Sequence, residues 1–244
     1  MIRRIEEHSL SALPALQTIY DDGWLLRFAN GYTRRANSIN PLYPAVDDLT
    51  AKTERAAALY RGRGLRPTFK ITDAAQPQDL DARLAELGYE ADPPTSVMTL
   101  NLPHTTLDIS PGVTCCELTG DWLRAYISLN GVDARHMPTI RQMLSSIALP
   151  ACFAMLRTGD DILAVGLAVA GGDYAGLYEI VTRADQRRRG LGRQMVSGLL
   201  RWGQDQGAHT IYLQVMGNNT PARNLYAGVG FTLCYSYWYR TPSP

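Results

Sequence analysis

The sequence lacks an excess of charge of either sign, and it lacks long apolar runs. Its 244 residues carry 24 Lys and Arg against 23 Asp and Glu, a formal net charge of +1. Because a surface that binds nucleic acid or an anionic membrane needs an excess of positive charge, neither partner is expected. No apolar stretch reaches the roughly 18 residues that a membrane-spanning helix requires. We therefore predict a soluble protein.

Cysteine is scarce, and its spacing matches no metal site. Cys115, Cys116, Cys152 and Cys234 form neither a C-x-x-C pair nor a zinc-ligand pattern. We expect buried, reduced thiols that behave as small hydrophobic side chains rather than a disulfide framework. The N-terminal stretch MIRRIEEHSL lacks the apolar core of a secretory signal. These features predict a cytoplasmic protein without a bound metal.

The second half of the chain predicts a mixed α/β domain. Glycine-containing turns separate three apolar runs at 151–158, 161–170 and 174–182, which is typical of neighbouring strands. Further strands are predicted at 112–118, 208–215 and 231–240, and helices at 119–131, 139–149, 190–207 and 220–229. Strands that alternate with helices in this way favour a sheet covered by helices.

The first half predicts fewer elements. Helices are expected at 47–64 and 77–88, strands at 65–72 and 95–102, and a pair of strands within 23–39 that is broken at Asn30-Gly31, a hairpin signal. The stretch 101–112 contains two prolines and many small polar residues, which is typical of a linker. We therefore predict two domains, 1–104 and 105–244.

The stretch RRRGLGRQMV, residues 187–196, predicts an anion site at a helix start. A helix N-terminus offers unpaired N–H groups and the positive end of a dipole, which suits a phosphate. Gly190 and Gly192 lack a Cβ and would let a pyrophosphate approach the backbone. The stretch is neither a P-loop nor a dinucleotide fingerprint, because it lacks G-K-[ST] and a third glycine. The alternative is a solvated basic helix start.

A second motif lies downstream, in LQVMGNNTPARNLYAGVGF at 213–231. Together with Arg187, Gly190 and Gly192, which fit the pattern [QR]-x-x-G-x-[GA], it resembles the GNAT superfamily of acyl-CoA-dependent N-acyltransferases. The second pattern, N-x-x-A-x-x-L-Y-x-x-x-G-F, matches Asn219, Ala222, Leu225, Tyr226, Gly230 and Phe231. The resemblance covers about residues 112–240. It implies the GNAT fold, a mixed and mostly antiparallel sheet with helices on both faces, and acetyl-CoA as the acyl donor.

The resemblance also implies the coenzyme contacts. Loop amides at 187–193 would hold the pyrophosphate, and the strand that ends at Val181–Arg183 would pair with the pantetheine arm as an added strand does. The implied set is Val181, Thr182, Arg183, Arg187, Arg188, Arg189, Gly190, Leu191, Gly192, Arg193, Asn219 and Tyr226.

Two residues are candidates for catalysis. Tyr226 stands where the family commonly uses a phenol to protonate the departing thiolate; the alternative is a packing aromatic. Glu179 stands in an apolar strand where many relatives carry an acid that acts as base on the substrate ammonium; the alternatives are a substrate-binding acid and a carboxylate paired to an arginine. His136 is interpreted as structural. Gln214 stands where some relatives have a glutamate, and a neutral amide cannot take a proton.

The first half contains helix–glycine–strand segments parallel to those of the second half, aligned on Gly88-Tyr89 and Gly230-Phe231. In that alignment Leu84 replaces Tyr226, and the glycine pair is missing. We interpret residues 1–104 as a smaller, degenerate GNAT-like domain that has lost coenzyme binding. The alternative is an unrelated α/β cap. Arg34 and Arg35 would line an acceptor pocket or pair with acids.

These observations predict an N-acetyltransferase that moves an acetyl group from acetyl-CoA to a primary amine of a small molecule or peptide by direct attack. The alternative is a non-catalytic acyl-CoA sensor. The sequence indicates neither the acceptor nor the oligomeric state.

Overall fold

The computed structural model describes residues 1–102 and 112–243, and the chain divides into two units. Unit 1 comprises Met1–Ser96, Met216–Asn218 and Tyr235–Pro244; unit 2 comprises Val97–Val215 and Asn219–Cys234. A single cut does not separate the units, because the last strand of the chain contributes to both. The predicted boundary between residues 104 and 105 lies outside the described residues, so a division there stays a prediction.

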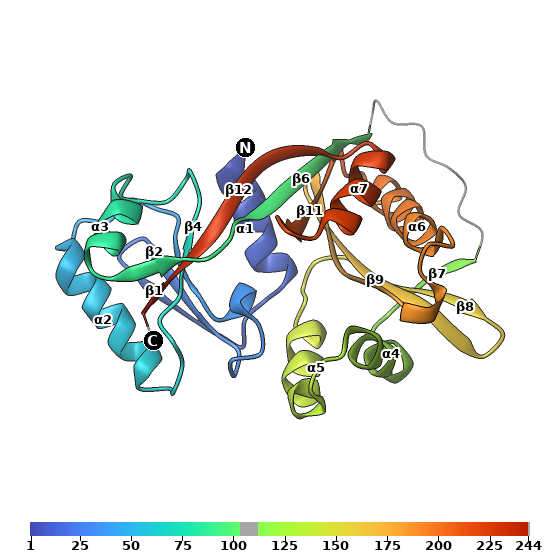
Figure 1. Cartoon of the computed structure of the whole chain (residues 1–244), viewed down its shortest axis with the longest axis horizontal. Helices are drawn as coiled ribbons and strands as arrows, with labels where there is room; N and C mark the ends of the chain where they lie inside the picture. Colours follow the sequence, from blue (N-terminus) through green and yellow to red (C-terminus); the bar gives the residue numbers. More distant parts are fainter. Residues whose placement is uncertain (103–111, 244) are drawn as a thin grey trace. The chain divides into compact units, whose positions relative to one another are not determined.

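Unit 1 is built on a sheet with the strand order β1-β2-β3-β4-β12, and β5 also pairs with β12 (Figure 1). Its strands are β1 (Gln17–Asp21), β2 (Trp24–Phe28), β3 (Ile39–Pro41), β4 (Phe69–Ile71), β5 (Tyr89–Ala91) and the end of β12 (Thr232–Pro242). Its helices are α1 (Ile2–Ala12), α2 (Leu49–Arg61) and α3 (Leu80–Glu86), with a 3-10 turn η1 (Arg34–Ala36). The two predicted helices are confirmed, whereas α1 was not predicted.

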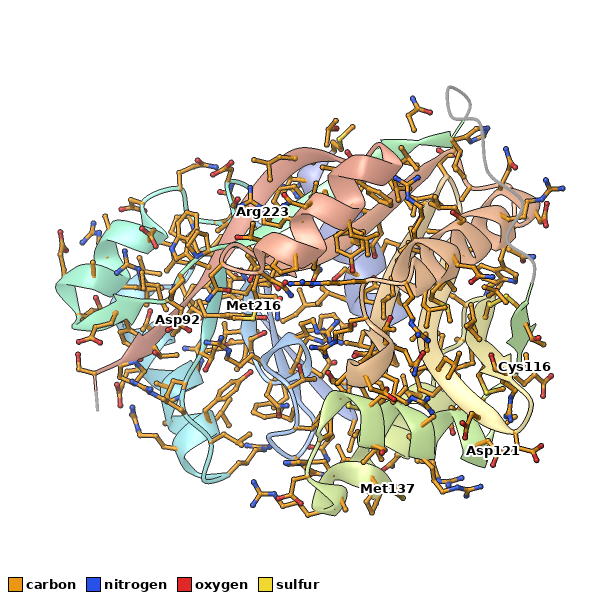
Figure 2. The ribbon with its side chains drawn as sticks, turned by 45° about the vertical axis from the view of Figure 1, so that its right-hand side comes forward. Asp92, Cys116, Asp121, Met137, Met216 and Arg223 are labelled. Atoms are coloured by element: carbon orange, nitrogen blue, oxygen red, sulfur yellow. A yellow bond between two sulfur atoms is a disulfide. The ribbon has the colours of Figure 1, made fainter. Side chains whose placement is uncertain are left out.

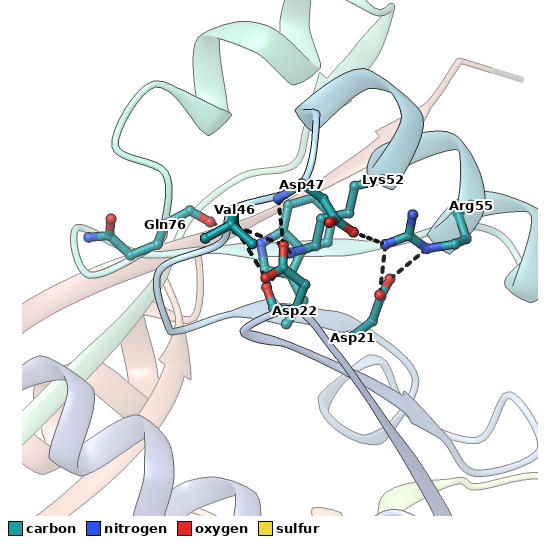
Figure 3. Close-up of polar contacts among 8 residues, drawn as sticks. Asp21, Asp22, Val46, Asp47, Lys52, Arg55 and Gln76 are labelled. Carbon is teal, nitrogen blue, oxygen red and sulfur yellow. Dashed lines mark hydrogen bonds and ion pairs between the residues drawn. The ribbon is translucent and has the colours of Figure 1, made fainter.

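The turn between β1 and β2 is tied to the start of α2 (Figure 3). Asp22 at the turn accepts a hydrogen bond from the backbone N–H of Asp47 at 2.9 Å and pairs with the buried Lys52 at 3.1 Å. Arg55 of α2 bridges Asp21 and Asp47, at 2.8 Å from each. The backbone hydrogen bond from Asp47 contributes most to lowering the pKa of Asp22, because it stabilises the ionised carboxylate. The hairpin turn therefore also fixes the loop that leads into α2.

The two faces of the unit 1 sheet differ in chemistry. Alternate residues of β2 and β4, such as Trp24, Leu26 and Phe69, join an apolar core with residues of α2 and α3. The residue between two core positions of β4, Lys70, is buried as well and pairs with Glu6 of α1. Glu6 also accepts a hydrogen bond from the Tyr235 hydroxyl at 2.6 Å. Buried charge on this face is thus compensated by a partner and by hydrogen bonds.

Unit 2 contains a mixed sheet with the strand order β6-β11-β10-β9-β8-β7 (Figure 1). The strands are β6 (Thr95–Asn101), β7 (Val113–Cys116), β8 (Ala151–Thr158), β9 (Asp161–Gly171), β10 (Tyr174–Thr182) and β11 (Thr210–Met216). Strands β7 to β10 pair antiparallel, whereas β10 and β11 are parallel. The predicted mixed, mostly antiparallel sheet is therefore present.

The helices of unit 2 are α4 (Gly120–Asn130), α5 (Met137–Ser145), α6 (Leu191–Asp205) and α7 (Thr220–Val229), with 3-10 turns η3 (Ala134–His136) and η4 (Ala184–Gln186). Met195 and Leu199 of α6 are fully buried in the core of unit 2. Gly166 of β9 lets α6 approach, because a Cβ there would lie 2.9 Å from Leu199 Cδ1. Trp122 of α4 packs edge-on against Phe153 of β8.

The expectation of four reduced, buried thiols is wrong. Cys115 of β7 and Cys152 of β8 form a disulfide with a Cα–Cα distance of 5.3 Å, and Cys115 is exposed. Cys116, labelled in Figure 2, and Cys234 are free and half-buried. The two bonded residues are 37 apart in sequence and meet because β7 and β8 pair antiparallel, which their spacing does not reveal. No helix within residues 1–102 and 112–243 is long and apolar enough to span a membrane.

Replacing Lys70 with Met should destabilise unit 1 by about 3–5 kcal/mol, because it leaves the buried Glu6 carboxylate without its cation. Urea unfolding measures this change. The double variant Lys70→Met/Glu6→Gln should regain part of the loss, since no unpaired charge remains buried. The matched control is Arg83→Ala, which breaks the exposed Arg83–Asp79 pair and should cost under about 1 kcal/mol. Equal effects of Lys70→Met and Arg83→Ala would contradict the buried pair.

Candidate functional site

The site begins with an irregularity in β10. Pairing with β9 is regular up to Tyr178–Leu167 and resumes at Val181–Val165, so two residues of β10 face one residue of β9. The first of these two, Glu179, has a positive φ of 50°. This conformation is uncommon for a residue with a Cβ and re-aims the side chain relative to the regular alternation of a strand. The irregularity therefore sets where Glu179 points.

The same region of β10 separates from β11. The parallel pairing of the two strands runs from Tyr174–Thr210 to Leu177–Leu213 and is not continued toward Val181 and Thr182. Both residues still pair with β9, at Val165 and Ala164. The other edge of β10 at 181–182 therefore faces the space between the diverging strands, where an amide-bearing ligand could add as a strand does.

The glycine-rich stretch leads from η4 into α6. Arg188 has φ +61°, and Gly190, the residue before α6, has φ +80°. A Cβ at Gly192 would lie 3.1 Å from Leu225 Cδ2, so this glycine lets α6 and α7 approach each other. The first N–H groups of α6 have no partner one turn earlier in the helix, as in every helix, and are available to an anion.

The helix α7 supplies the opposite wall. Asn219 is its N-cap, and its side-chain oxygen accepts a hydrogen bond from the N–H of Ala222 at 3.2 Å. Tyr226 is 9% exposed and packs edge-on against Phe231, with ring centroids 6.0 Å apart. Burial raises the pKa of Tyr226 to about 12, because the phenolate would lose its hydration. Tyr226 is therefore a neutral phenol near neutral pH.

These elements enclose a cavity of about 780 Å³. It is lined by Asn130, Ile180, Val181, Thr182, Gln186, Arg187, Arg188, Gly190, Leu191, Gly192, Arg193, Asn219, Pro221, Ala222, Leu225 and Tyr226. Strand β10, the start of α6 and the start of α7 thus meet at one cleft, with arginines at the η4–α6 turn. Its volume lies in the usual range of ligand sites, about 300–1,000 Å³.

Most of the predicted coenzyme contacts line this cavity, but two do not. Arg183 donates its backbone N–H to Leu163 at 2.8 Å, and its side chain pairs with Asp161 and Asp185. Arg189 donates to the side chain of Gln186 at 2.7 Å. Arg193 does line the cavity and also donates to the carbonyl of Gly228, which links α6 to α7.

Glu179 is half-buried and is absent from the cavity lining, although Ile180, the next residue of β10, lines the cavity. Its carboxylate accepts a hydrogen bond from the Tyr126 hydroxyl of α4 at 2.6 Å, and that hydroxyl accepts one from Asn130 Nδ2 at 3.2 Å. Neither Tyr126 nor Asn130 was predicted, because they precede Glu179 by about fifty residues and belong to no local motif. His136 and Gln214 are absent from the cavity lining.

Within the described residues no group of three or more His, Cys, Asp or Glu side chains could hold a metal ion. The titratable side chains that line the cavity are instead the phenol of Tyr226 and the guanidinium groups of Arg187, Arg188 and Arg193.

The comparisons with known proteins agree with this geometry. The family model described as "Probable histone acetyltransferase Rv0428c C-terminal" matches residues 1–240. The chain is 29% identical to an uncharacterized N-acetyltransferase, YobR, of Bacillus subtilis (strain 168), over 98% of each chain. It is 28% identical to the probable histone acetyltransferase Rv0428c of Mycobacterium tuberculosis, over 95% of this chain and 71% of the relative.

A GCN5-related N-acetyltransferase from Kribbella flavida has a similar fold. Its structure aligns with a TM-score of 0.74 at 14% identity, over 99% of this chain and 95% of that one. The fold, the two motifs and the family match together show that the chain belongs to the Rv0428c C-terminal acetyltransferase family and is an N-acetyltransferase of the GNAT type.

Proposed function

We propose that the protein transfers an acetyl group from acetyl-CoA to a primary amine of a small molecule or peptide. The observation that carries this proposal is the cleft of unit 2, which combines a free strand edge, a glycine-containing helix start and a buried phenol. The mycobacterial relative is named a probable histone acetyltransferase, which supports an amine acceptor such as a lysine side chain.

The cleft fits a ligand with an anionic and an amide-bearing part. Arg187, Arg188 and the helix start at Gly190–Gly192 would hold the pyrophosphate, and the edge of β10 at Val181 and Thr182 would pair with the pantetheine amides. Arg183 and Arg189 pair with neighbouring side chains and would contribute only to the local charge. Acetyl-CoA, when bound there, supplies a thioester whose carbonyl carbon an amine can attack.

Glu179 is the proposed base. It would take a proton from the substrate ammonium, so that the nitrogen lone pair is available to form the new C–N bond as the C–S bond breaks. Its carboxylate accepts a hydrogen bond from the Tyr126 hydroxyl, which holds one of its oxygens in place.

Tyr226 is proposed to assist the departure of sulfur. A phenol with a pKa of about 12 is a weaker acid than an ordinary thiol with a pKa near 8.5, so complete proton transfer would be uphill by about 5 kcal/mol. A hydrogen bond donated to the sulfur as its negative charge develops has no such cost. The proton can reach the thiolate from solvent afterwards. Burial therefore favours a hydrogen-bonding role over the proton donor inferred from the motif.

Residues 1–104 are proposed to form a degenerate GNAT-like domain that does not bind coenzyme. In this part of the chain the loop before α2 carries Asp47 and Asp48, which would repel a pyrophosphate. In unit 2, two observations support the expected helices on both faces: Trp122 of α4 packs against Phe153 of β8, and Met195 of α6 belongs to a core cluster that includes the next residue of β8, Ala154.

Acetyl-CoA should raise the midpoint of thermal unfolding, because a ligand that binds only the folded state stabilises it, by about 2.7 kcal/mol at a hundred times its Kd. Thiol release should then require an amine, tested with a polyamine, an amino sugar and a lysine-containing peptide. A raised midpoint without thiol release would favour an acyl-CoA sensor. No stabilisation by acetyl-CoA or a longer acyl-CoA would contradict both functions.

Replacing Gly192 with Val should weaken coenzyme A binding at least about tenfold, a free-energy change of about 1.4 kcal/mol. The new side chain would enter the space between α6 and Leu225, where the cleft is already narrow. Calorimetric titration with coenzyme A measures the affinity. Gln204→Val, at an exposed position near the end of the same helix, controls for the poorer helix propensity of valine. Equal affinities of the two variants for coenzyme A would mean that the pyrophosphate does not bind at the start of α6.

Replacing Tyr226 with Phe should lower kcat about tenfold and leave the affinity for coenzyme A within about twofold, because only the hydrogen bond to the leaving sulfur is lost. Steady-state thiol release at saturating acetyl-CoA gives kcat. Tyr174→Phe, on β10 and absent from the cavity lining, is the control. An unchanged kcat would mean that Tyr226 only packs against its neighbours and does not assist the reaction.

A further inference from the structure

Tyr126 and Asn130 form a hydrogen-bonded network with Glu179 that the packing of apolar side chains alone does not require. Tyr126 and Asn130 stand one turn apart on α4, and their side chains form a series of two hydrogen bonds that ends at the Glu179 carboxylate. The Tyr126 hydroxyl donates to Glu179 and accepts from Asn130, so both of its hydrogen-bonding functions are used in one direction. Asn130 is exposed and lines the cavity, whereas Tyr126 is 2% exposed. The network therefore leads from the cavity wall to the carboxylate.

The tyrosine is held in place by a second aromatic residue. Its ring stacks on Trp122, with centroids 5.4 Å apart and planes 15° from parallel. The Trp122 indole N–H donates to the carbonyls of Ala154 at 3.1 Å and Gly166 at 3.2 Å. Gly166 lies between the two β9 residues that pair on either side of the irregularity in β10. Trp122 thus anchors the tyrosine to the strand position that faces Glu179.

Glu179 itself needs such support. Its left-handed backbone is strained for a residue with a Cβ and persists only where the surroundings determine it. A carboxylate at the end of a flexible side chain would otherwise sample several rotamers. A base must lie within hydrogen-bond reach of the proton it removes, so loss of position reduces the rate without changing the chemistry.

We propose that Tyr126, supported by Asn130, is a positioning residue that holds the Glu179 carboxylate at the cleft for attack by the amine. This inference rests on the proposed function, in which Glu179 is the base. Tyr126 acts through Glu179 and touches neither the acyl donor nor the amine.

The test is a double-mutant cycle of Tyr126→Phe and Glu179→Gln, measured by thiol release from acetyl-CoA with the fastest acceptor of the amine panel. Tyr126→Phe should lower kcat about tenfold and leave KM for acetyl-CoA within about twofold. In the Glu179→Gln background the same change should alter kcat less than about twofold, because the group that it positions is no longer a base.

Two further variants keep the test sharp. Asn130→Ala removes an exposed side chain and should lower kcat about two- to threefold, because Asn130 contacts Glu179 only through Tyr126. This variant tests the network even if Tyr126→Phe does not fold. Tyr212→Phe is the control: it removes a buried hydroxyl beside β10 that bonds to the hydroxyl of Tyr178, and kcat should change less than about twofold.

The outcomes separate the two ideas. A large effect of Glu179→Gln with no effect of Tyr126→Phe or Asn130→Ala overturns the positioning role and keeps the base. Equal losses from Tyr126→Phe in both backgrounds also overturn the positioning role, since Tyr126 would then act independently of Glu179. An unchanged kcat in Glu179→Gln overturns the base role and the inference that depends on it.

Discussion

The interruption of strand pairing at Glu179 and Ile180 is the constraint on which the site depends. One additional residue in β10 interrupts the regular ladder with β9, which resumes at Val181, and β10 leaves β11 over the same few residues. A continuous ladder would use every N–H and C=O group of β10 and would leave no edge for a ligand. The same interruption turns Glu179 toward α4, so the free edge and the carboxylate have one structural origin.

Local patterns predicted the elements of the chain well, because each depends on nearby residues. The helical spacing of apolar residues at 190–207 predicted α6, and Asp48, the N-cap of α2, lies within the stretch 47–64 that was predicted as a helix. The hairpin predicted at Asn30-Gly31 was partly right, because β2 and β3 flank this dipeptide and pair antiparallel. The connection between them is not a tight turn, however, since it contains η1; the tight turn is at Asp22-Gly23, between β1 and β2. A dipeptide favours a turn without fixing which strands the turn joins.

Contacts between residues that are far apart in the sequence could not be predicted from local patterns. The glycines of the α6 start were evident from a motif, whereas Tyr126 and Asn130 are placed by the packing of α4 and carry no local signal. The disulfide depends on the pairing of β7 with β8, and α1 has its buried face partly occupied by Glu6 and His8, which hides its apolar pattern. Each miss involves a partner that is remote in sequence.

The strand β12 has a consequence for the order of synthesis. Its first residues, Thr232–Cys234, belong to unit 2, and its later residues belong to unit 1, where they pair with β4 and β5. Unit 1 therefore lacks an internal strand of its sheet until the ribosome has made β12. At 5–20 residues per second, the roughly 140 residues between Ser96 and Tyr235 represent about 7–28 s of translation. During that interval the unpaired edge of β4 is a surface that a chaperone could protect.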